Sequence, residues 1–367
     1  MKKLYATFLA TVIGLGFSAS VRAELLVASV GPTSGQFAVL GEQLRQGARQ
    51  AVDDINAQGG INGEKLVFEM ADDACEDEQA LATANRLTGR GAALVVGHFC
   101  SESSIAASPV YVDSRIVQIS PATSNPRFTD ERPGPGIYRV YGRSDQQGAV
   151  IGKMLADKFG IANIAVAQDG TAYGKGLAEA TRSALAESGK KEVLYEQIEA
   201  GQNDYSDLID KLKRSEVDVL FFSGYHNEAA VIARQIQAAG LTTQLIAGDS
   251  LFTDDFWLAA GDAGEGTLVA AALDPRTLPA NTPLSVKFRE NEVEPEGYVY
   301  YAYAAVEAWA EAVRAAGSSE YEAVVEQLNS GTYDTVLGEM SFDDKGDTSL
   351  PSFVFYRWQN GNLTILR

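Results

Sequence analysis

One short segment of the chain carries the residue types of an anion-binding site. Residues 97–104 read Gly-His-Phe-Cys-Ser-Glu-Ser-Ser and follow an apolar run at 92–96. This order predicts a strand, a hydroxyl-rich turn and then the first turn of a helix. The free N–H groups and the dipole of a helix N-terminus both favour negative charge. Serine is also a common helix cap, so the hydroxyl of Ser101 alone does not establish a ligand site.

The two cysteines of the chain occupy similar places. Cys100 lies in the segment just described, and Cys75 ends a second strand–turn segment at 71–75. In an oxidising compartment this placement favours a disulfide bond between them, at the rim of a ligand cleft. On the chain-entropy account, such a bridge stabilises the fold by about 3–4 kcal/mol. Two buried free thiols are the alternative.

Residues 1–23 have the pattern of a secretory signal peptide. Lys2 and Lys3 precede a largely apolar stretch at 4–17, and residues 21–23 read Val-Arg-Ala, a small-residue cleavage site. No cysteine lies near that site to carry a lipid anchor. No later stretch reaches the roughly 18 apolar residues that a membrane span requires. We therefore expect a free periplasmic protein, with an uncleaved N-terminal anchor as the alternative.

The composition excludes several classes of function. The chain has 49 acidic and 30 basic residues and a net charge of −19. This balance disfavours nucleic acid and anionic membranes as partners. His98 and His226 have no metal-ligand spacing, and no Gly-x-Ser-x-Gly nucleophile elbow follows the leader. We therefore expect no metal site, no cofactor and no hydrolase activity.

The elements that must position these residues alternate between strands and helices. Apolar runs typical of strands lie at 25–30, 66–70, 94–96, 116–119, 164–167, 193–198, 217–222, 245–247 and 352–358. Helical spacing is found at 41–58, 77–87, 147–159, 173–186, 205–212, 228–239 and 298–316. Strands separated by helices predict doubly wound parallel sheets, and 367 residues exceed one ordinary core. Ligands of such sheets bind beyond the carboxyl ends of the strands, where the candidate residues lie.

A series of motifs resembles the periplasmic leucine/isoleucine/valine-binding proteins, the type I solute receptors of ABC importers. These motifs lie at residues 47–51, 54–57, 59–63, 72–75, 97–101, 119–121, 173–178 and 344–347. The resemblance covers essentially the whole chain after the leader. It implies an α/β fold of two doubly wound, three-layer lobes joined by three crossings near residues 141, 273 and 349. Lobe 1 would then comprise residues 24–141 and 274–349, and lobe 2 residues 142–273 and 350–367.

The resemblance also implies an amino acid held between the lobes. Ser101 and Ser124, with Thr123 beside the latter, match positions that hold the carboxylate and ammonium from lobe 1. Asp249 matches the acidic residue of lobe 2 that takes the ammonium, although in a Gly-Asp-Ser sequence it is equally a turn residue. Other positions that match the ligand site are Leu40, Phe99, Cys100, Tyr173, Tyr225 and Tyr298. A buried zwitterion needs such donors and acceptors, because burying an unpaired charge is costly.

Two departures from the family pattern bear on specificity. Asp249 stands where relatives commonly carry Glu, which shortens the side chain by about 1.5 Å. Phe99 stands where Leu is usual and fills side-chain space. We therefore expect a small or slim ligand such as alanine, valine, proline or 4-aminobutyrate, and weaker binding of leucine than of valine. The family also implies a monomer and an inner-membrane ABC permease as partner; a ligand sensor of the same fold is the alternative.

Overall fold

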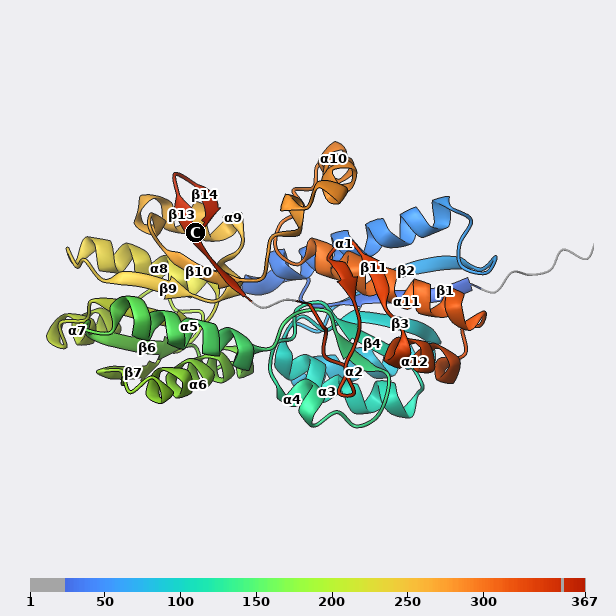
Figure 1. The fold of residues 1–367 in the computed structure, drawn as a ribbon, viewed down its shortest axis with the longest axis horizontal. Helices are drawn as coiled ribbons and strands as arrows, with labels where there is room; N and C mark the ends of the chain where they lie inside the picture. The colour runs from blue at the N-terminus through green and yellow to red at the C-terminus, as the bar shows by residue number, and fades with distance from the viewer. Residues whose placement is uncertain (1–23, 351–352, 367) are drawn as a thin grey trace, which may run out of the picture.

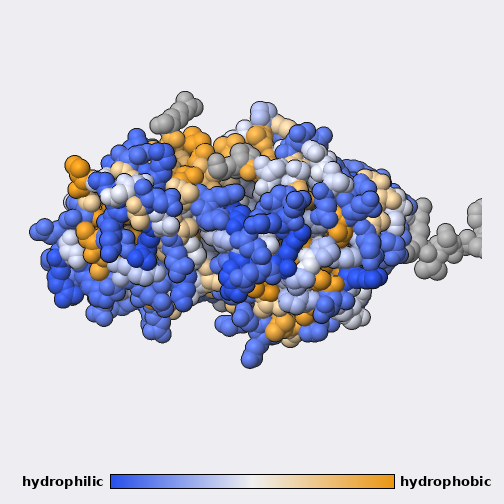
Figure 2. Space-filling model, turned by 60° about the horizontal axis from the view of Figure 1, so that its bottom comes forward, coloured by the Kyte–Doolittle hydropathy of each residue, from blue (hydrophilic) through white to orange (hydrophobic). Residues whose placement is uncertain are grey.

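The protein forms two lobes lying side by side along its long axis (Figure 1). The computed structural model describes residues 24–350 and 353–366. The expected leader at 1–23 and Ser352, the first residue of the last expected strand, lie outside these ranges. Across the described residues, no helix combines the length and apolar character that crossing a membrane requires. The face in Figure 2 is predominantly hydrophilic, in keeping with the acidic composition.

The first lobe is built on a five-stranded parallel sheet of strand order β2-β1-β3-β4-β5. Its strands are β1 (Glu24–Val30), β2 (Lys65–Ala71), β3 (Ala92–Gly97), β4 (Val117–Ser120) and β5 (Ile137–Arg139). One face packs on α1 (Ala38–Ala57) and α11 (Val299–Ala316), and the other on α2 (Asp77–Gly89) and α3 (Ser101–Asp113). Smaller elements complete the lobe: α4 (Arg127–Asp130), α10 (Thr282–Glu290), α12 (Tyr321–Ser330), β11 (Tyr333–Thr335) and β12 (Gly338–Met340).

The second lobe contains a seven-stranded sheet of order β14-β13-β10-β9-β8-β6-β7. Its strands are β6 (Ile164–Gln168), β7 (Leu194–Gln197), β8 (Val219–Ser223), β9 (Gln244–Ala247), β10 (Leu268–Ala271), β13 (Val354–Gln359) and β14 (Asn362–Ile365). Helices α5 (Ser144–Phe159) and α6 (Ala172–Glu187) cover one face. Helices α7 (Ser206–Arg214), α8 (His226–Ala238) and α9 (Asp254–Ala260) cover the other. Both lobes therefore have the expected three layers.

The second sheet differs from expectation at one edge. Strand β13 pairs with β10 and with β14 in antiparallel orientation, so this sheet is mixed rather than wholly parallel. Asn360 and Gly361 join β13 to β14, and both have positive φ, the conformation that a two-residue hairpin turn requires. Trp358 of β13 is fully buried against the second core. A hairpin needs no crossover helix, so the last strand can return antiparallel.

The chain passes between the lobes at three places. It leaves the first lobe after β5, returns after β10, and crosses again between β12 and β13. The buried guanidinium of Arg139 pairs with Asp347 (Nε–Oδ1 2.6 Å), and Arg143 pairs with the other oxygen of the same carboxylate (2.8 Å). Asp347 therefore ties the first crossing to the segment that leads into the third.

Candidate functional site

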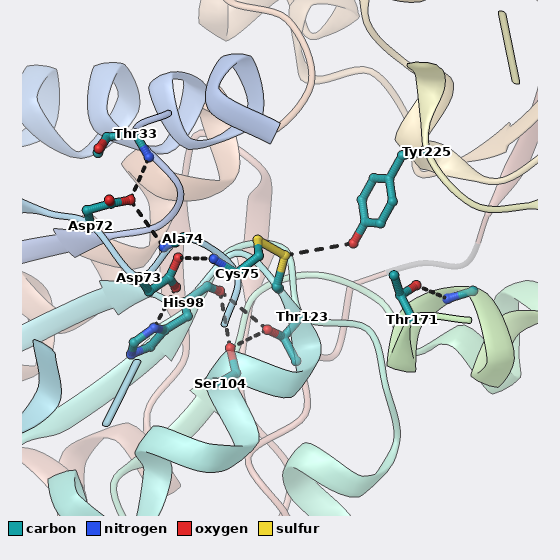
Figure 3. Close-up of a disulfide and its surroundings, with 12 residues drawn as sticks. Thr33, Asp72, Asp73, Ala74, Cys75, His98, Ser104, Thr123, Thr171 and Tyr225 are labelled. Atoms are coloured by element: carbon teal, nitrogen blue, oxygen red, sulfur yellow. Dashed lines mark hydrogen bonds and ion pairs between the residues drawn. A yellow bond between two sulfur atoms is a disulfide. The ribbon is translucent and has the colours of Figure 1, made fainter. Parts of the chain in front are cut away.

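The hydroxyl-rich segment forms the turn between β3 and α3, as expected. Cys100 is the N-cap of α3, and Ser101 is its first residue. Cys100 is bonded to Cys75, with their Cα atoms 5.4 Å apart, so the expected disulfide is confirmed. Figure 3 shows this bridge in the first lobe, with the hydroxyl of Tyr225 pointing toward it from the second lobe at 4.0 Å from Cys100 Sγ. The disulfide therefore stands at the rim where the lobes face each other.

A buried network of hydroxyl groups holds the backbone of this turn by hydrogen bonds. The backbone carbonyl of His98 accepts hydrogen bonds from Ser120 Oγ (2.9 Å), Ser104 Oγ (3.2 Å) and Thr123 Oγ1 (3.3 Å). Ser104 Oγ and Thr123 Oγ1 also lie 2.5 Å apart. The hydroxyl of Thr123 is thus engaged in the network that supports the turn (Figure 3).

The side chain of His98 also fixes this turn, through contacts with two other buried side chains. Its Nδ1 lies 2.7 Å from Asp73 Oδ2, and its Nε2 lies 2.9 Å from the hydroxyl of Tyr111. All three side chains are buried. Asp73 also accepts from the backbone N–H of Cys75 (3.0 Å). His98 therefore connects the two cysteine-bearing turns.

Ser101, at the start of α3, and Ser124, in the loop after β4, are not part of this hydroxyl network. Among the described residues, Ser101 Oγ accepts one long hydrogen bond, from the N–H of Asn125 (3.4 Å). Ser124 Oγ is buried and has no hydrogen-bond partner among the described residues. The guanidinium of Arg139 donates to the carbonyls of Thr123 (2.9 Å) and Asn125 (3.0 Å), on either side of Ser124. Arg139, which the sequence did not single out, thus sets the backbone that carries this hydroxyl.

The second lobe contributes a buried carboxylate with three donors. Asp249 lies two residues after the end of β9, at the start of a short 3-10 helix. Its Oδ1 accepts from Gln147 Nε2 (2.7 Å) and from the hydroxyl of Tyr173 (3.0 Å). Its Oδ2 accepts from the hydroxyl of Tyr298 (2.6 Å), which comes from the first lobe at the start of α11. Asp249, Tyr173 and Tyr298 therefore come together as expected, with Gln147 as an addition.

Aromatic rings from both lobes pack against one another near this carboxylate. Phe99 of the first lobe lies 5.2 Å from Tyr298 and 6.3 Å from Tyr225, measured between ring centroids. Tyr225 in turn lies 5.3 Å from Tyr173. Leu40 of α1 is buried in the same cluster. The structure thus gathers the expected apolar residues from both lobes into one buried cluster.

Two further rings of this cluster were missed from the sequence. Phe37 lies 4.5 Å from Tyr225, and Tyr141, on the first crossing, lies 5.5 Å from Tyr298. Phe37 precedes the helical pattern of α1, and Tyr141 lies between β5 and α5, so neither belonged to a periodic segment. Their only signal was an aromatic residue just before a helix, in the case of Phe37, or at a crossing, in the case of Tyr141.

The tyrosine hydroxyls beside Asp249 act as hydrogen-bond donors. Burial raises the pKa of Tyr173 and of Tyr298 well above the usual value, and the negative charge of Asp249 adds to the shift. Both side chains therefore stay protonated at neutral pH. A buried carboxylate with fixed donors, among aromatic rings from both lobes, is suited to bind the ammonium group of a small zwitterion.

Polar contacts join the lobes around this site. Asn125 Nδ2 donates to the carbonyl of Ala172, and Asn227 Nδ2 donates to the carbonyl of Gln36, both at 2.9 Å. These bonds link the segment before α4 to the start of α6, and the short 3-10 helix Gly35–Phe37 before α1 to the start of α8. The lobes are therefore in contact on more than one side of the cleft.

Glu296, before α11, makes a further contact between the lobes. Its carboxylate accepts from Thr253 Oγ1 and from the N–H of Asp254, each at 2.8 Å, at the start of α9. Burial raises the pKa of Glu296 to about 7. The contact is thus sensitive to the ionisation of one carboxyl group.

Comparison with known proteins points to one family. The profile described as periplasmic binding protein matches residues 24–362. A Brucella melitensis protein named Leu/Ile/Val-binding protein homolog 1 is 41% identical over 362 residues, covering 98% of this chain and 97% of that protein. A Pseudomonas aeruginosa protein named amino acid binding protein is 41% identical over 349 residues, covering 94% and 93%.

Solved structures share the fold. The leucine-binding protein LivK of Thermotoga maritima superposes with a TM-score of 0.85 at 23% identity, covering 94% of this chain and 98% of that one. An ABC transporter substrate-binding protein of Desulfitobacterium hafniense, in complex with Leu, gives a TM-score of 0.77 at 27% identity, covering 94% and 100%. The two-lobed α/β fold of this chain is thus shared with these structures.

Proposed function

Because the chain belongs to the periplasmic binding protein family, we propose that it is the amino-acid receptor of an ABC importer. The ligand lies between the lobes, with its carboxylate at Ser101 and Ser124 and its ammonium at Asp249. The observation that carries this proposal is the buried Asp249, which receives hydroxyl donors from both lobes, Tyr173 and Tyr298. The polar end of the site is therefore complete only when the lobes are together.

The receptor works by closure rather than by chemistry. A ligand that contacts both lobes stabilises the closed arrangement over the open one, and so shifts the equilibrium between them. An inner-membrane ABC permease then receives the closed, loaded receptor. We place the mature protein in the periplasm as a monomer, after removal of residues 1–23, with lobe boundaries near residues 141, 273 and 349. Operation as a ligand sensor would use the same closure.

The ligand is a branched-chain or small aliphatic amino acid. The named relatives point to leucine, isoleucine and valine, whereas two residues of this chain favour the smaller members of the class. The ring of Phe99 lies between those of Tyr225 and Tyr298 and takes up side-chain space. Asp249 is one methylene shorter than the Glu common in relatives. We therefore place valine, alanine, proline and 4-aminobutyrate ahead of leucine.

Isothermal titration of the refolded, ligand-free mature protein tests this proposal. Valine is expected to bind more tightly than leucine, in a one-to-one complex. Leucine binding at least tenfold tighter than valine would contradict the proposed preference for small ligands, but not the proposal that the protein is an amino-acid receptor. Failure of every amino acid to bind would overturn the receptor itself. Stimulation of the reconstituted permease's ATPase by the loaded receptor would then separate import from sensing.

A further inference from the structure

Gln147 is the contact of Asp249 that the sequence did not single out. It lies in the first turn of α5, just after the first crossing, and its side chain is fully buried. Its Nε2 donates to Asp249 Oδ1 (2.7 Å) and to the backbone carbonyl of Ala270 (2.8 Å). Ala270 belongs to β10, the strand that leads into the second crossing. Gln147 therefore joins the ligand-facing carboxylate to the frame of the second lobe.

The amide of Gln147 has one acceptable orientation. Both neighbours of Nε2 are acceptors, so a flipped amide would place its oxygen against the Asp249 carboxylate and the Ala270 carbonyl. The residues around this amide and the Asp249 carboxylate are also closely packed. A Cβ atom added at Gly248 would lie 2.4 Å from the Tyr173 hydroxyl and 3.4 Å from Gln147 Nε2. The hydrogen bond from Gln147 thus holds the carboxylate of Asp249 in a single position.

This position decides how long a ligand the cleft accepts. The ligand must span from the serines of the first lobe to Asp249, so the location of that carboxylate sets the separation of the ligand's two charges. We propose that Gln147 is a positioning residue that sets ligand length by fixing the carboxylate of Asp249. The inference rests on the proposed function, because it takes Asp249 as the ammonium acceptor.

The first experiment replaces Gln147 by methionine, which keeps the volume and removes the donor. The probes are alanine, 3-aminopropanoate, 4-aminobutyrate and 5-aminopentanoate, whose charges are progressively further apart, with affinities measured by titration calorimetry. In the wild type one length is expected to dominate. In Gln147→Met the best ligand should weaken at least tenfold, and its advantage over the next length should fall to threefold or less. An unchanged ranking with affinities within threefold would overturn the inference.

A matched control isolates the contact from the general loss of a buried amide. Gln168 is also a buried glutamine of the second lobe, but its Nε2 donates to Gln197 Oε1 (3.1 Å) rather than to Asp249. Gln168→Met should lower thermal stability yet leave the ranking of ligand lengths unchanged. If it changes the ranking as Gln147→Met does, the effect belongs to the lobe as a whole and the inference is wrong.

A second variant, Gln147→Glu, tests the donor itself and remains informative if the methionine variant does not fold. A protonated glutamic acid can donate its O–H to Asp249, whereas the ionised form repels it. The other ionisable groups facing this position are the hydroxyls of Tyr141, Tyr173 and Tyr298, and burial raises the pKa of each well above its usual value. Glu102 and Glu296, whose pKa values burial raises to about 7, titrate in the wild type as well. Relative to the wild type at the same pH, affinity and length selectivity of this variant should therefore recover from about pH 8 to about pH 5.

The outcomes separate this inference from the proposed function. If the wild type binds none of the probes and none of the amino acids, the receptor proposal fails. If the wild type binds with a clear length preference, while Gln147→Glu shows no recovery at low pH and Gln147→Met keeps the preference, the role of Gln147 alone fails.

Discussion

Replacing Asp249 by asparagine removes the negative charge at the proposed ammonium site while keeping the side-chain size. The carboxylate receives three hydrogen bonds, from Gln147, Tyr173 and Tyr298. In the variant one amide position becomes a donor, and a tyrosine hydroxyl can turn to accept from it. The fold should therefore survive, whereas the buried ammonium of the ligand loses its charged partner.

The loss of affinity follows from the burial of that charge pair. Removing one partner of a buried, hydrogen-bonded charge pair costs about 2–5 kcal/mol. This corresponds to a loss in affinity between about 30-fold and about 4,000-fold. Titration calorimetry with valine, alongside the melting temperature of the free protein, measures both the affinity and the integrity of the fold.

A second aspartate provides the control. Asp54 of α1 accepts from Tyr303 and from Gln50, each at 2.9 Å, as Asp249 accepts from tyrosine and glutamine, but it also pairs with Lys287 and is not among the proposed ligand-binding residues. Asp54→Asn should change stability without changing affinity. Affinity of Asp249→Asn within threefold of the wild type would refute the assignment of the ammonium site.

Three further predictions concern the cleft, the disulfide and the lobe contact. Phe99→Leu should improve leucine relative to valine about tenfold by calorimetry, because it vacates side-chain space, and an unchanged ratio would contradict the steric role of Phe99. Cys75→Ser should lower the free energy of unfolding by about 3–4 kcal/mol in urea titrations, because it removes the disulfide to Cys100. A loss below about 1 kcal/mol would show that the disulfide contributes little to the stability of the fold. The raised pKa of Glu296 means that the folded form binds a proton more tightly than the unfolded form, so stability falls as pH rises from about 4.5 to about 7. In thermal melts over that pH range, the stability of Glu296→Gln should fall less than that of the wild type. Identical dependence of stability on pH in the two proteins would contradict the role given to Glu296.

The periodic segments of the chain were predictable, and the irregular ones were not. The parallel strands and long helices follow from apolar runs and helical spacing, because burial of one face dictates those patterns. The short strand β10 and the helices α9, α10 and α12 lack long patterns, and tertiary packing decides them. The Asn360-Gly361 pair is a typical hairpin turn and could have predicted that the last two strands are antiparallel. The prediction of wholly parallel sheets did not include such a hairpin.

The candidate site divides in the same way. Residues that follow strands, such as Ser101 and Asp249, could be placed because the fold brings the carboxyl ends of strands together. The sequence could not tell Thr123 from Ser124, since only the structure shows the former bonded to the His98 carbonyl and the latter without a partner. Gln147 gave no signal at all, because a buried glutamine on a helix gains its role only through contacts distant in sequence.

The measurement that tests the amino-acid receptor most directly is a thermal-shift screen of residues 24–367. The protein would be stripped of ligand by unfolding and refolding, then assayed with the standard amino acids and 4-aminobutyrate. A ligand that binds only the folded state raises the melting temperature, and the rise grows with the logarithm of the ratio of ligand concentration to Kd. A clear rise with valine, alanine, proline or 4-aminobutyrate, larger than that with leucine, is the predicted result. No rise with any of these compounds would contradict the assignment of this cleft to amino acids.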